Sequence, residues 1–274
     1  MPTIVTRDGI RLFAKSWGHG RPVVLTHGWP LSADSWDDQA VVLADAGYKV
    51  IAYDRRGFGR SDQPWSGYDY DTLADDLADV LEATESQDAT IVGFSMGGGE
   101  IARYMSRHNG RRMAQAGLIS SVVPYLLKTD SNPDGAPPTV FEDMLKQITD
   151  DRALFFSSFF EQFYGMGVFS QPVSSETLQW SRNVAMMAGL RPTLECVKAF
   201  SKTDFRPDMA SFRVPTLIVH GTGDKTVPID PTARAAARAL GPLAKLVEYE
   251  DAPHGLNVTH KKTLAHELLT FLGG

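Results

Sequence analysis

The chain has 274 residues but only one cysteine, Cys196, so it cannot form a disulfide bond within itself. No uninterrupted apolar stretch approaches the ~20 residues that a helix needs to cross a bilayer. The N-terminus also lacks the charged segment followed by an apolar segment that characterises a secretion signal. From these absences we expect a protein of the reducing cytoplasm that has no membrane-spanning segment.

Clustered positive charge is missing as well. The chain carries 27 Lys and Arg against 33 Asp and Glu, for a net charge of −6, and its basic residues are scattered. Nucleic-acid binding depends on clustered Lys and Arg, so we expect no nucleic-acid partner. The sequence contains no H-E-x-x-H, no C-x-x-C and no strand-linked G-x-G-x-x-G, and Gly93 to Gly99 lacks the Lys-Ser/Thr of a phosphate loop. We therefore predict that the protein uses no metal and no cofactor.

Apolar residues make up 43% of the chain, which suffices for a large core in one α/β domain. Short apolar runs alternate with helical patterns, as is typical of a parallel sheet covered by helices on both faces. The runs lie at residues 22–26, 49–54, 89–94, 116–123, 215–221 and 245–250, and the helical patterns near 35–46, 71–85, 97–108, 230–239 and 260–272. Residues 3–17 precede them as a hairpin that turns at Asp8-Gly9. The predicted fold class is a doubly wound, mostly parallel α/β sheet.

One long interval, from about Pro124 to Asp208, contains no convincing strand. Its helical segments are rich in Phe, Met and Trp, and Thr139-x-x-Glu142 predicts a capping box at the start of the first of them. We interpret residues 124–208 as a helical cap inserted into a core of residues 1–123 and 209–274, within a single structural domain. Most aromatic side chains of the cap are expected to form its own core. They include Phe155, Phe156, Phe159, Phe160, Phe163 and Trp180.

Residues 91–99, IVGFSMGGG, place a serine between an apolar strand and the start of a helix. Residues 93–97 fit G-x-S-x-G, the nucleophile elbow, in which a sharp turn lifts the serine above the edge of the sheet. The sharpness of the turn explains the flanking glycines, because a side chain there would collide with backbone. The helix that follows directs its N-terminal amides toward the serine, where they would stabilise negative charge. Ser95 is therefore the predicted nucleophile.

A serine hydroxyl is a weak nucleophile, so it needs a base, and the base needs a carboxylate that orients it. His254, in DAPHGLN, follows the last predicted strand, and Asp224, in HGTGDKTVP, follows the strand before it. Three residues of catalytic type thus each come directly after a strand. Their chain order, Ser95, Asp224, His254, is the order expected in α/β-hydrolases. The pattern predicts a serine triad.

An oxyanion hole would complete such a site. THGWP at residues 26–30 follows an early strand, which places the N–H of Trp29 to act with that of Met96, the residue after the nucleophile. Pro30 restricts Trp29 to extended backbone conformations. His27 is expected to hold this loop by hydrogen bonds rather than to take part in the chemistry.

Two further patterns are interpreted as structural. Asp54, Arg55 and Arg56 could bind an anion, but the glycines after them and their position behind a strand favour a turn. Cys196 lies in a helical pattern and is expected to be a small buried hydrophobic residue.

Taken together, these motifs resemble the α/β-hydrolase superfamily and, within it, the cofactor-free haloperoxidases and aryl esterases. The matching segments, which with the cap cover essentially the whole chain, are THGWP, DSW at residues 34–36, YDRRGFGRSDQPWSGYDYDT, GFSMGGGE, GTGDKTVP and APHGLNVTH. The resemblance implies the same triad, Ser95, Asp224 and His254, with Trp29 and Met96 as oxyanion donors. It also implies a homo-oligomer.

The predicted function is that of a serine hydrolase that acts on small carboxylic or aryl esters through an acyl-enzyme. Hydrogen peroxide in place of water would yield a peracid that oxidises halide in solution, which explains haloperoxidase activity without haem or metal. Hydrolysis of a lactam or of a C–C bond by the same triad and ligand binding by a hydrolase-fold receptor remain alternatives. Dehalogenases and epoxide hydrolases of this fold use an aspartate where Ser95 lies. The expected substrate pocket is lined by Trp29, Phe94, Val122, Tyr125, Phe159, Phe163 and Val227.

Overall fold

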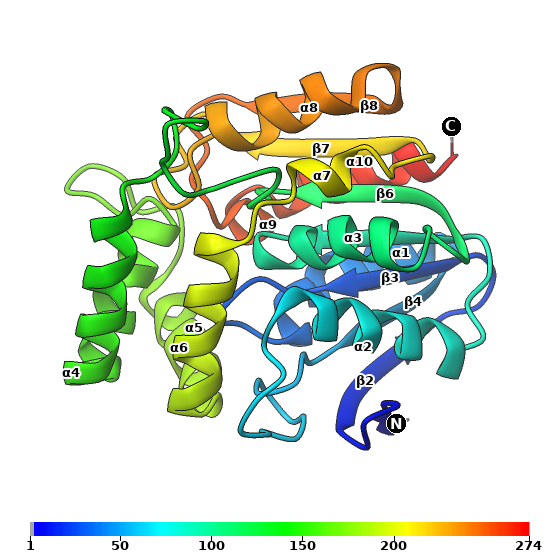
Figure 1. Cartoon of the computed structure of the whole chain (residues 1–274), viewed down its shortest axis with the longest axis horizontal. Helices are drawn as coiled ribbons and strands as arrows, with labels where there is room; N and C mark the ends of the chain where they lie inside the picture. Colours follow the sequence, from blue (N-terminus) through cyan, green and yellow to red (C-terminus); the bar gives the residue numbers. More distant parts are fainter. Residues whose placement is uncertain (1–2, 274) are drawn as a thin grey trace.

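The computed structural model describes residues 3–273, and it contains one eight-stranded sheet (Figure 1). The strand order is β1-β2-β4-β3-β5-β6-β7-β8, in which the pairs β1–β2 and β2–β4 are antiparallel and the other five pairs are parallel. The strands are β1 Thr3–Val5, β2 Arg11–Trp17, β3 Pro22–Thr26, β4 Lys49–Tyr53, β5 Ala89–Phe94, β6 Met113–Ile119, β7 Thr216–Gly221 and β8 Ala244–Tyr249. The predicted fold class, a mostly parallel α/β sheet, is confirmed.

Helices cover both faces of this sheet. Contacts join α2 to α3, α3 to α7 and α7 to α8 on one face, and α1 to α10 on the other (Figure 1). The helices of the core are η1 Ala33–Trp36, α1 Asp37–Asp45, α2 Tyr70–Ala83, α3 Met96–Arg107, α7 Arg206–Met209, η2 Asp230–Arg234, α8 Ala235–Leu240, η3 Gly241–Leu243, α9 Leu256–Thr259 and α10 Lys261–Gly273. Among residues 3–273, no helix has both the length and the apolar composition that a membrane crossing requires.

Burial explains why the central strands carry continuous apolar runs. Every residue of β3, β5 and β7 is buried, because helices pack on both sides of these strands. The edge strand β8 instead has partly buried and exposed residues up to its last residue, Tyr249, which is buried. The predicted hairpin is also present, since Gly9 adopts φ 85° and donates its N–H to Thr6 O at 2.8 Å. These features follow directly from local sequence pattern.

The predicted limits of one strand were wrong. The run at 116–123 was expected to be a strand throughout, but β6 spans Met113–Ile119. Ser120 adopts φ 44°, a left-handed conformation that no strand continues through. Its N–H still bonds to Val219 O at 2.8 Å, after which the chain leaves the sheet. The remaining apolar residues, such as Val122, are therefore free to face the space above the sheet.

Between β6 and β7 the described chain holds helices and no strand element. Ahead of the short α7 come three long helices, which lie beside the carboxyl ends of the parallel strands (Figure 1): α4 Pro138–Phe163, α5 Ser175–Met187 and α6 Leu190–Lys202. The predicted capping box was wrong, because α4 begins at Pro138 and its N-cap, Pro137, makes no side-chain bond. Proline fixes φ at a helical value and suits the first turn, so the helix starts one residue before Thr139.

The aromatic side chains of this helical segment are mostly buried, as expected. Phe156, Phe160 and Phe163 are fully buried and Phe155 is nearly so. Trp180 differs, because 36% of its surface is exposed.

The loop after β4 is held by a buried ion pair. Arg55 pairs with Glu100 of α3, and both side chains are only 1% exposed. Glu100 also accepts hydrogen bonds from Thr26 Oγ1 at 2.6 Å and Tyr53 Oη at 2.8 Å. Arg55 Nη2 donates to His27 O at 2.6 Å. The pair thus connects β3, the β4 loop and the nucleophile helix, in agreement with the structural interpretation of this loop.

The neighbouring charges of the loop are paired in the same way. Arg56 binds Asp76 at 2.6 Å and Asp8 at 2.9 Å, while Asp54 binds Arg60 at 2.8 Å. These side chains are therefore committed to contacts within the fold.

Replacing Glu100 with Leu is expected to lower the free energy of unfolding by about 3–5 kcal/mol, because it leaves the buried charge of Arg55 without a partner. Urea denaturation followed by circular dichroism measures the loss. As a control, Asp150→Ala removes an exposed partner of Lys146 and should cost little. Equal losses of unfolding free energy in the two variants would show that the buried pair stabilises the fold no more than an exposed pair does.

Candidate active site

The turn between β5 and α3 is as sharp as the glycine pattern suggests. Ser95 adopts φ 54° and ψ −115° between the last residue of β5 and the first of α3. A Cβ on Gly93 would lie 2.5 Å from the backbone of Gly97, and one on Gly97 would lie 2.7 Å from Thr26 O. Neither position has room for a side chain. This crowding explains the serine set among glycines.

The three predicted triad residues lie together at the carboxyl edge of the sheet. His254 Nε2 is 2.9 Å from Ser95 Oγ, and His254 Nδ1 is 2.6 Å from Asp224 Oδ2. The side chains follow β5, β7 and β8, which lie in the same half of the sheet with only β6 between β5 and β7. All three are buried, with Ser95 6% exposed. The arrangement forms one continuous chain of hydrogen bonds from a hydroxyl to a carboxylate.

Electrostatics keep the Asp224 carboxylate ionised. Burial by itself would raise the pKa of Asp224, but the charge of His254 and hydrogen bonds from His220 and His254 outweigh it, and the pKa lies well below its usual range. Oδ1 also accepts the backbone N–H groups of Thr226 at 2.9 Å and Val227 at 2.8 Å. A carboxylate held in this way fixes the imidazole and stabilises positive charge on it.

The predicted oxyanion donors flank this chain of hydrogen bonds. Met96 is the first residue of α3, and Trp29 lies in the loop after β3. Within residues 3–273, no protein acceptor binds the N–H of either residue, so both are free to meet a ligand. The Trp29 indole donates to Thr193 O of α6 at 3.2 Å. That bond connects the loop to the helices above the sheet.

His27 holds the same loop through both ring nitrogens. Its Nδ1 lies 2.9 Å from Gly28 O, and its Nε2 accepts the Arg55 backbone N–H at 3.0 Å. The ring is fully buried, and neither of these hydrogen-bond partners belongs to the predicted triad. The hydrogen bonds by which His27 was expected to hold this loop are confirmed.

Acid should destabilise the protein partly through His27. Burial, together with the charge of Arg55, lowers the pKa of His27 well below its ordinary value. The unfolded chain takes up a proton on this ring below about pH 6.5 while the native ring stays neutral, so the free energy of unfolding falls as pH drops below that value. The contribution approaches about 1.4 kcal/mol per pH unit.

Urea unfolding of the wild type and His27→Gln between about pH 5 and pH 7.5 tests this expectation. Gln offers an acceptor to Arg55 N–H but does not titrate, so the stability of the variant should depend less on pH. Parallel stability curves for the two proteins would contradict the role assigned to His27.

A cavity of about 570 Å³ opens above Ser95 and His254. Four of the residues predicted to line the pocket do so: Trp29, Val122, Phe159 and Val227. Further apolar lining residues are Leu126, Phe141, Met144, Phe155 and Phe200. Polar lining residues are Asp143, Gln147, Ser158, Gln162, Lys225 and Thr226. One part of the wall is therefore aromatic and another is polar.

Three predicted pocket residues do not line the cavity. Phe94 and Phe163 are fully buried, and their rings pack against His254 with centroids 5.2 Å and 4.9 Å from its ring. They hold the imidazole from behind, so no surface remains for a substrate. Tyr125 instead packs under the guanidinium of Arg206, 4.9 Å from its ring centroid. The pocket prediction was wrong at these positions.

The lining residues that sequence reasoning missed come mainly from α4. Asp143 and Gln147 are four apart, as are Phe155 and Phe159, and Ser158 and Gln162, so each pair shares a helix face. The spacing of these pairs can be seen in the sequence, but it does not indicate which face of the helix lies toward the sheet.

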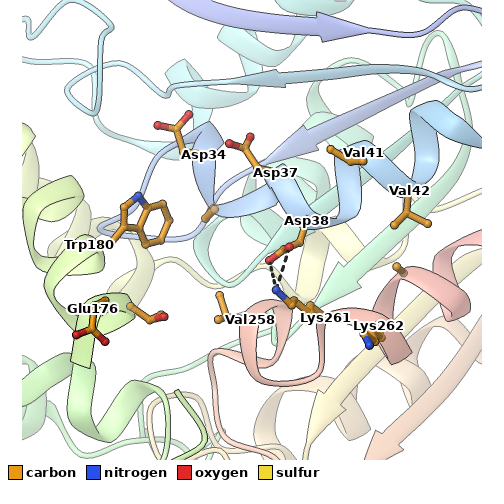
Figure 2. Close-up of a pocket in the computed structure, with 13 residues that line it drawn as sticks. Asp34, Asp37, Asp38, Val41, Val42, Glu176, Trp180, Val258, Lys261 and Lys262 are labelled. Carbon is orange, nitrogen blue, oxygen red and sulfur yellow. Dashed lines mark hydrogen bonds and ion pairs between the residues drawn. The ribbon is translucent and has the colours of Figure 1, made fainter. Parts of the chain in front are cut away.

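A second hollow lies on the outer surface between α1, α10 and α5 (Figure 2). Its volume is about 870 Å³, and its walls combine Val41, Val42 and Trp180 with charged side chains. Figure 2 shows one of these charges, Lys261, directed at Asp38, which it contacts at 3.1 Å. Neither Ser95 nor His254 lines this hollow, so we assign the chemistry to the smaller cavity.

Comparison with known proteins supports a single family. A family model described as the alpha/beta hydrolase fold matches residues 21–261. The chain is 43% identical to a non-heme chloroperoxidase of Kitasatospora aureofaciens and 41% identical to a bifunctional esterase/perhydrolase of Acinetobacter calcoaceticus, each over 99% of both chains. A bromoperoxidase structure from Bacillus anthracis superimposes with a TM-score of 0.95 at 42% identity over 99% of both chains. The chain belongs to the α/β-hydrolase family and, within it, to the non-heme haloperoxidases and esterases.

Proposed function

We propose that this protein is a serine hydrolase that cleaves small carboxylic esters, including aryl esters, through an acyl-enzyme. The observation that carries the proposal is the chain of hydrogen bonds from Ser95 Oγ through His254 to Asp224, which opens on a partly aromatic cavity. The names of the relatives, esterase/perhydrolase and chloroperoxidase, agree with it.

In the proposed acylation, His254 Nε2 removes the proton of Ser95 as Oγ attacks the ester carbonyl. Asp224 keeps the other proton of the ring on Nδ1 and stabilises the imidazolium that forms. The free N–H groups of Trp29 and Met96 would bind the developing oxyanion. The imidazolium then returns its proton to the leaving alcohol or phenol, and the acyl group remains on Ser95.

In the second half, His254 activates water, which attacks the acyl-enzyme and releases the carboxylic acid. Hydrogen peroxide can replace water as the attacking group, and the product is then a peracid. The peracid oxidises halide in free solution, so this activity requires no halide site. The perhydrolase and haloperoxidase names of the relatives fit this branch of the reaction.

The cavity is consistent with a small ester that has one aromatic or apolar part. Three rings that line it, Phe155, Phe159 and Phe200, lie around Trp29 at centroid distances of 5.3–6.3 Å. We propose that this wall receives the apolar part of the ester. The lactamase and receptor alternatives are not favoured, because the esterase and peroxidase names of the relatives give no support to either.

Phenyl acetate hydrolysis, with and without added peroxide, tests the proposal. Acetic acid and peracetic acid should both form when peroxide is present, and only acetic acid when it is absent. The peracid fraction then places the protein between esterase and perhydrolase. Absence of turnover on phenyl acetate together with rapid turnover of a lactam would overturn the ester assignment.

Three broader features belong to the same proposal. The core comprises residues 1–123 and 209–274, whose ends 1–2 and 274 lie outside the described residues, and residues 124–208 form the cap. The protein works in the cytoplasm, where its one thiol, the buried Cys196, stays reduced. It forms a homo-oligomer, which light scattering after size-exclusion chromatography would measure directly.

A further inference from the structure

A second histidine contacts the carboxylate of Asp224. His220 lies on β7, four residues before Asp224, and its side chain is completely buried. Its Nε2 is 2.9 Å from Val227 O and 3.2 Å from Asp224 Oδ2. The proposed reaction steps make no use of this ring, although burying an imidazole is costly without a compensating contact.

The protonation state of His220 follows from its neighbours. Val227 O and Asp224 Oδ2 can only accept hydrogen bonds, so Nε2 must carry a proton. Nδ1 is buried and meets no partner within the described part of the chain. A proton there would add a charge and an unpaired N–H to a ring without solvent contact. The ring is therefore neutral and presents one N–H.

Four N–H groups surround the Asp224 carboxylate, two at each oxygen. Oδ1 accepts from the backbone of Thr226 and Val227. Oδ2, the oxygen that faces His254, meets one other donor among the described residues, which is His220 Nε2. His220 thus acts on the same oxygen that orients His254.

Other charges near His220 are already paired. Glu248 lies opposite His220 in the register of β7 and β8, but its carboxylate binds Arg234 at 2.6 Å. His254, in the loop after β8, faces His220 only through Asp224. The single N–H of His220 therefore acts on Val227 O and Asp224 Oδ2.

We propose that His220 is a positioning residue of this hydrolase: its neutral Nε2–H holds Asp224 Oδ2 against His254 and weakens the attraction of that oxygen for the His254 proton. The same N–H holds Val227 O and so closes the loop that carries Asp224. His254 then gives up its proton readily between the two halves of the reaction. The kinetic part of this inference rests on the proposed function, whereas the contact with Asp224 does not.

Three variants test the role of His220. His220→Leu removes the N–H, and His220→Gln places an amide N–H near the position of Nε2. Thr216→Val, a buried change on the same strand without contact to Asp224, controls for loss of stability. In His220→Leu we expect kcat to fall by about 10- to 100-fold, as for outer partners of functional histidines, with KM nearly unchanged. The acid limb of the rate profile of His220→Leu should move to higher pH. In His220→Gln, both kcat and the acid limb should lie close to those of the wild type.

Proton and nitrogen NMR of the histidine rings supplies a readout that needs no substrate. In the wild type, His220 should carry its proton on Nε2 only. In His220→Leu, the signal of the His254 Nδ1–H should titrate at higher pH than in the wild type. A proton on His220 Nδ1, or equal titration of His254 in both proteins, would overturn the inference even if phenyl acetate proves not to be a substrate. Equal loss of kcat in His220→Leu and Thr216→Val would overturn it as well.

Discussion

Replacing Ser95 with Ala is expected to lower ester turnover by about 10⁴-fold or more, by comparison with other serine triads. The change removes only Oγ, the atom that lies 2.9 Å from His254 Nε2. Without it no acyl-enzyme can form, and the oxyanion donors and cavity account for whatever rate remains. Initial rates on phenyl acetate, with peracetic acid read separately, measure the loss.

The fold should survive this change. Alanine keeps the Cβ of Ser95 at the turn between β5 and α3, and among the described residues only His254 forms a hydrogen bond with Oγ. The melting temperature of Ser95→Ala should therefore stay close to that of the wild type. Ser211→Ala, on the loop after α7, is the matched control and should retain full turnover. Substantial activity in a well-folded Ser95→Ala protein would exclude the proposed nucleophile.

Asp224→Asn should be nearly as damaging, with kcat lowered by about 10⁴-fold as in the corresponding change in another serine triad. The reason lies in the two donors on Oδ1. Because Thr226 and Val227 direct their N–H groups at this position, the amide oxygen of Asn must occupy it. The NH₂ group then faces His254 Nδ1, which forces the ring proton onto Nε2. A ring in that state cannot accept the proton of Ser95.

The double variant provides a stringent check. Because Ser95 and Asp224 act through one imidazole, Ser95→Ala with Asp224→Asn should be hardly slower than Ser95→Ala alone. Asp230→Asn, which alters an exposed partner of Arg234, is the control and should leave turnover unchanged. Losses that multiply in the double variant would mean that the two residues act independently.

The local sequence pattern was sufficient to predict those parts of the molecule whose residue types are fixed by steric constraints. The elbow is one example, because Gly93 and Gly97 are required wherever a helix leaves a strand so abruptly. The position of Asp224 after the buried strand β7 and of His254 after the edge strand β8 is another. Parallel strands bring their carboxyl ends to one edge, so residues far apart in the chain meet there.

Contacts that depend on three-dimensional packing were beyond reach of the sequence. Phe94 and Phe163 are aromatic, as pocket residues often are, but their rings pack against His254 instead of lining the cavity. The start of α4 depended on Pro138, whose effect on helix geometry overrode a capping pattern one residue later. The sequence shows His220 only as a histidine within an apolar strand. Its contact with Asp224 depends on how the loop after β7 folds back, which the sequence pattern does not reveal.

The most direct test of the account is covalent labelling with a p-nitrophenyl phosphonate, which a serine nucleophile attacks as if it were an ester and which water does not readily release. Peptide mass spectrometry should find one adduct, on the peptide that contains Ser95, and release of p-nitrophenol should match it in amount. Ser95→Ala should remain unlabelled. Labelling at another residue, or active wild-type protein that resists the reagent, would contradict Ser95 as the nucleophile.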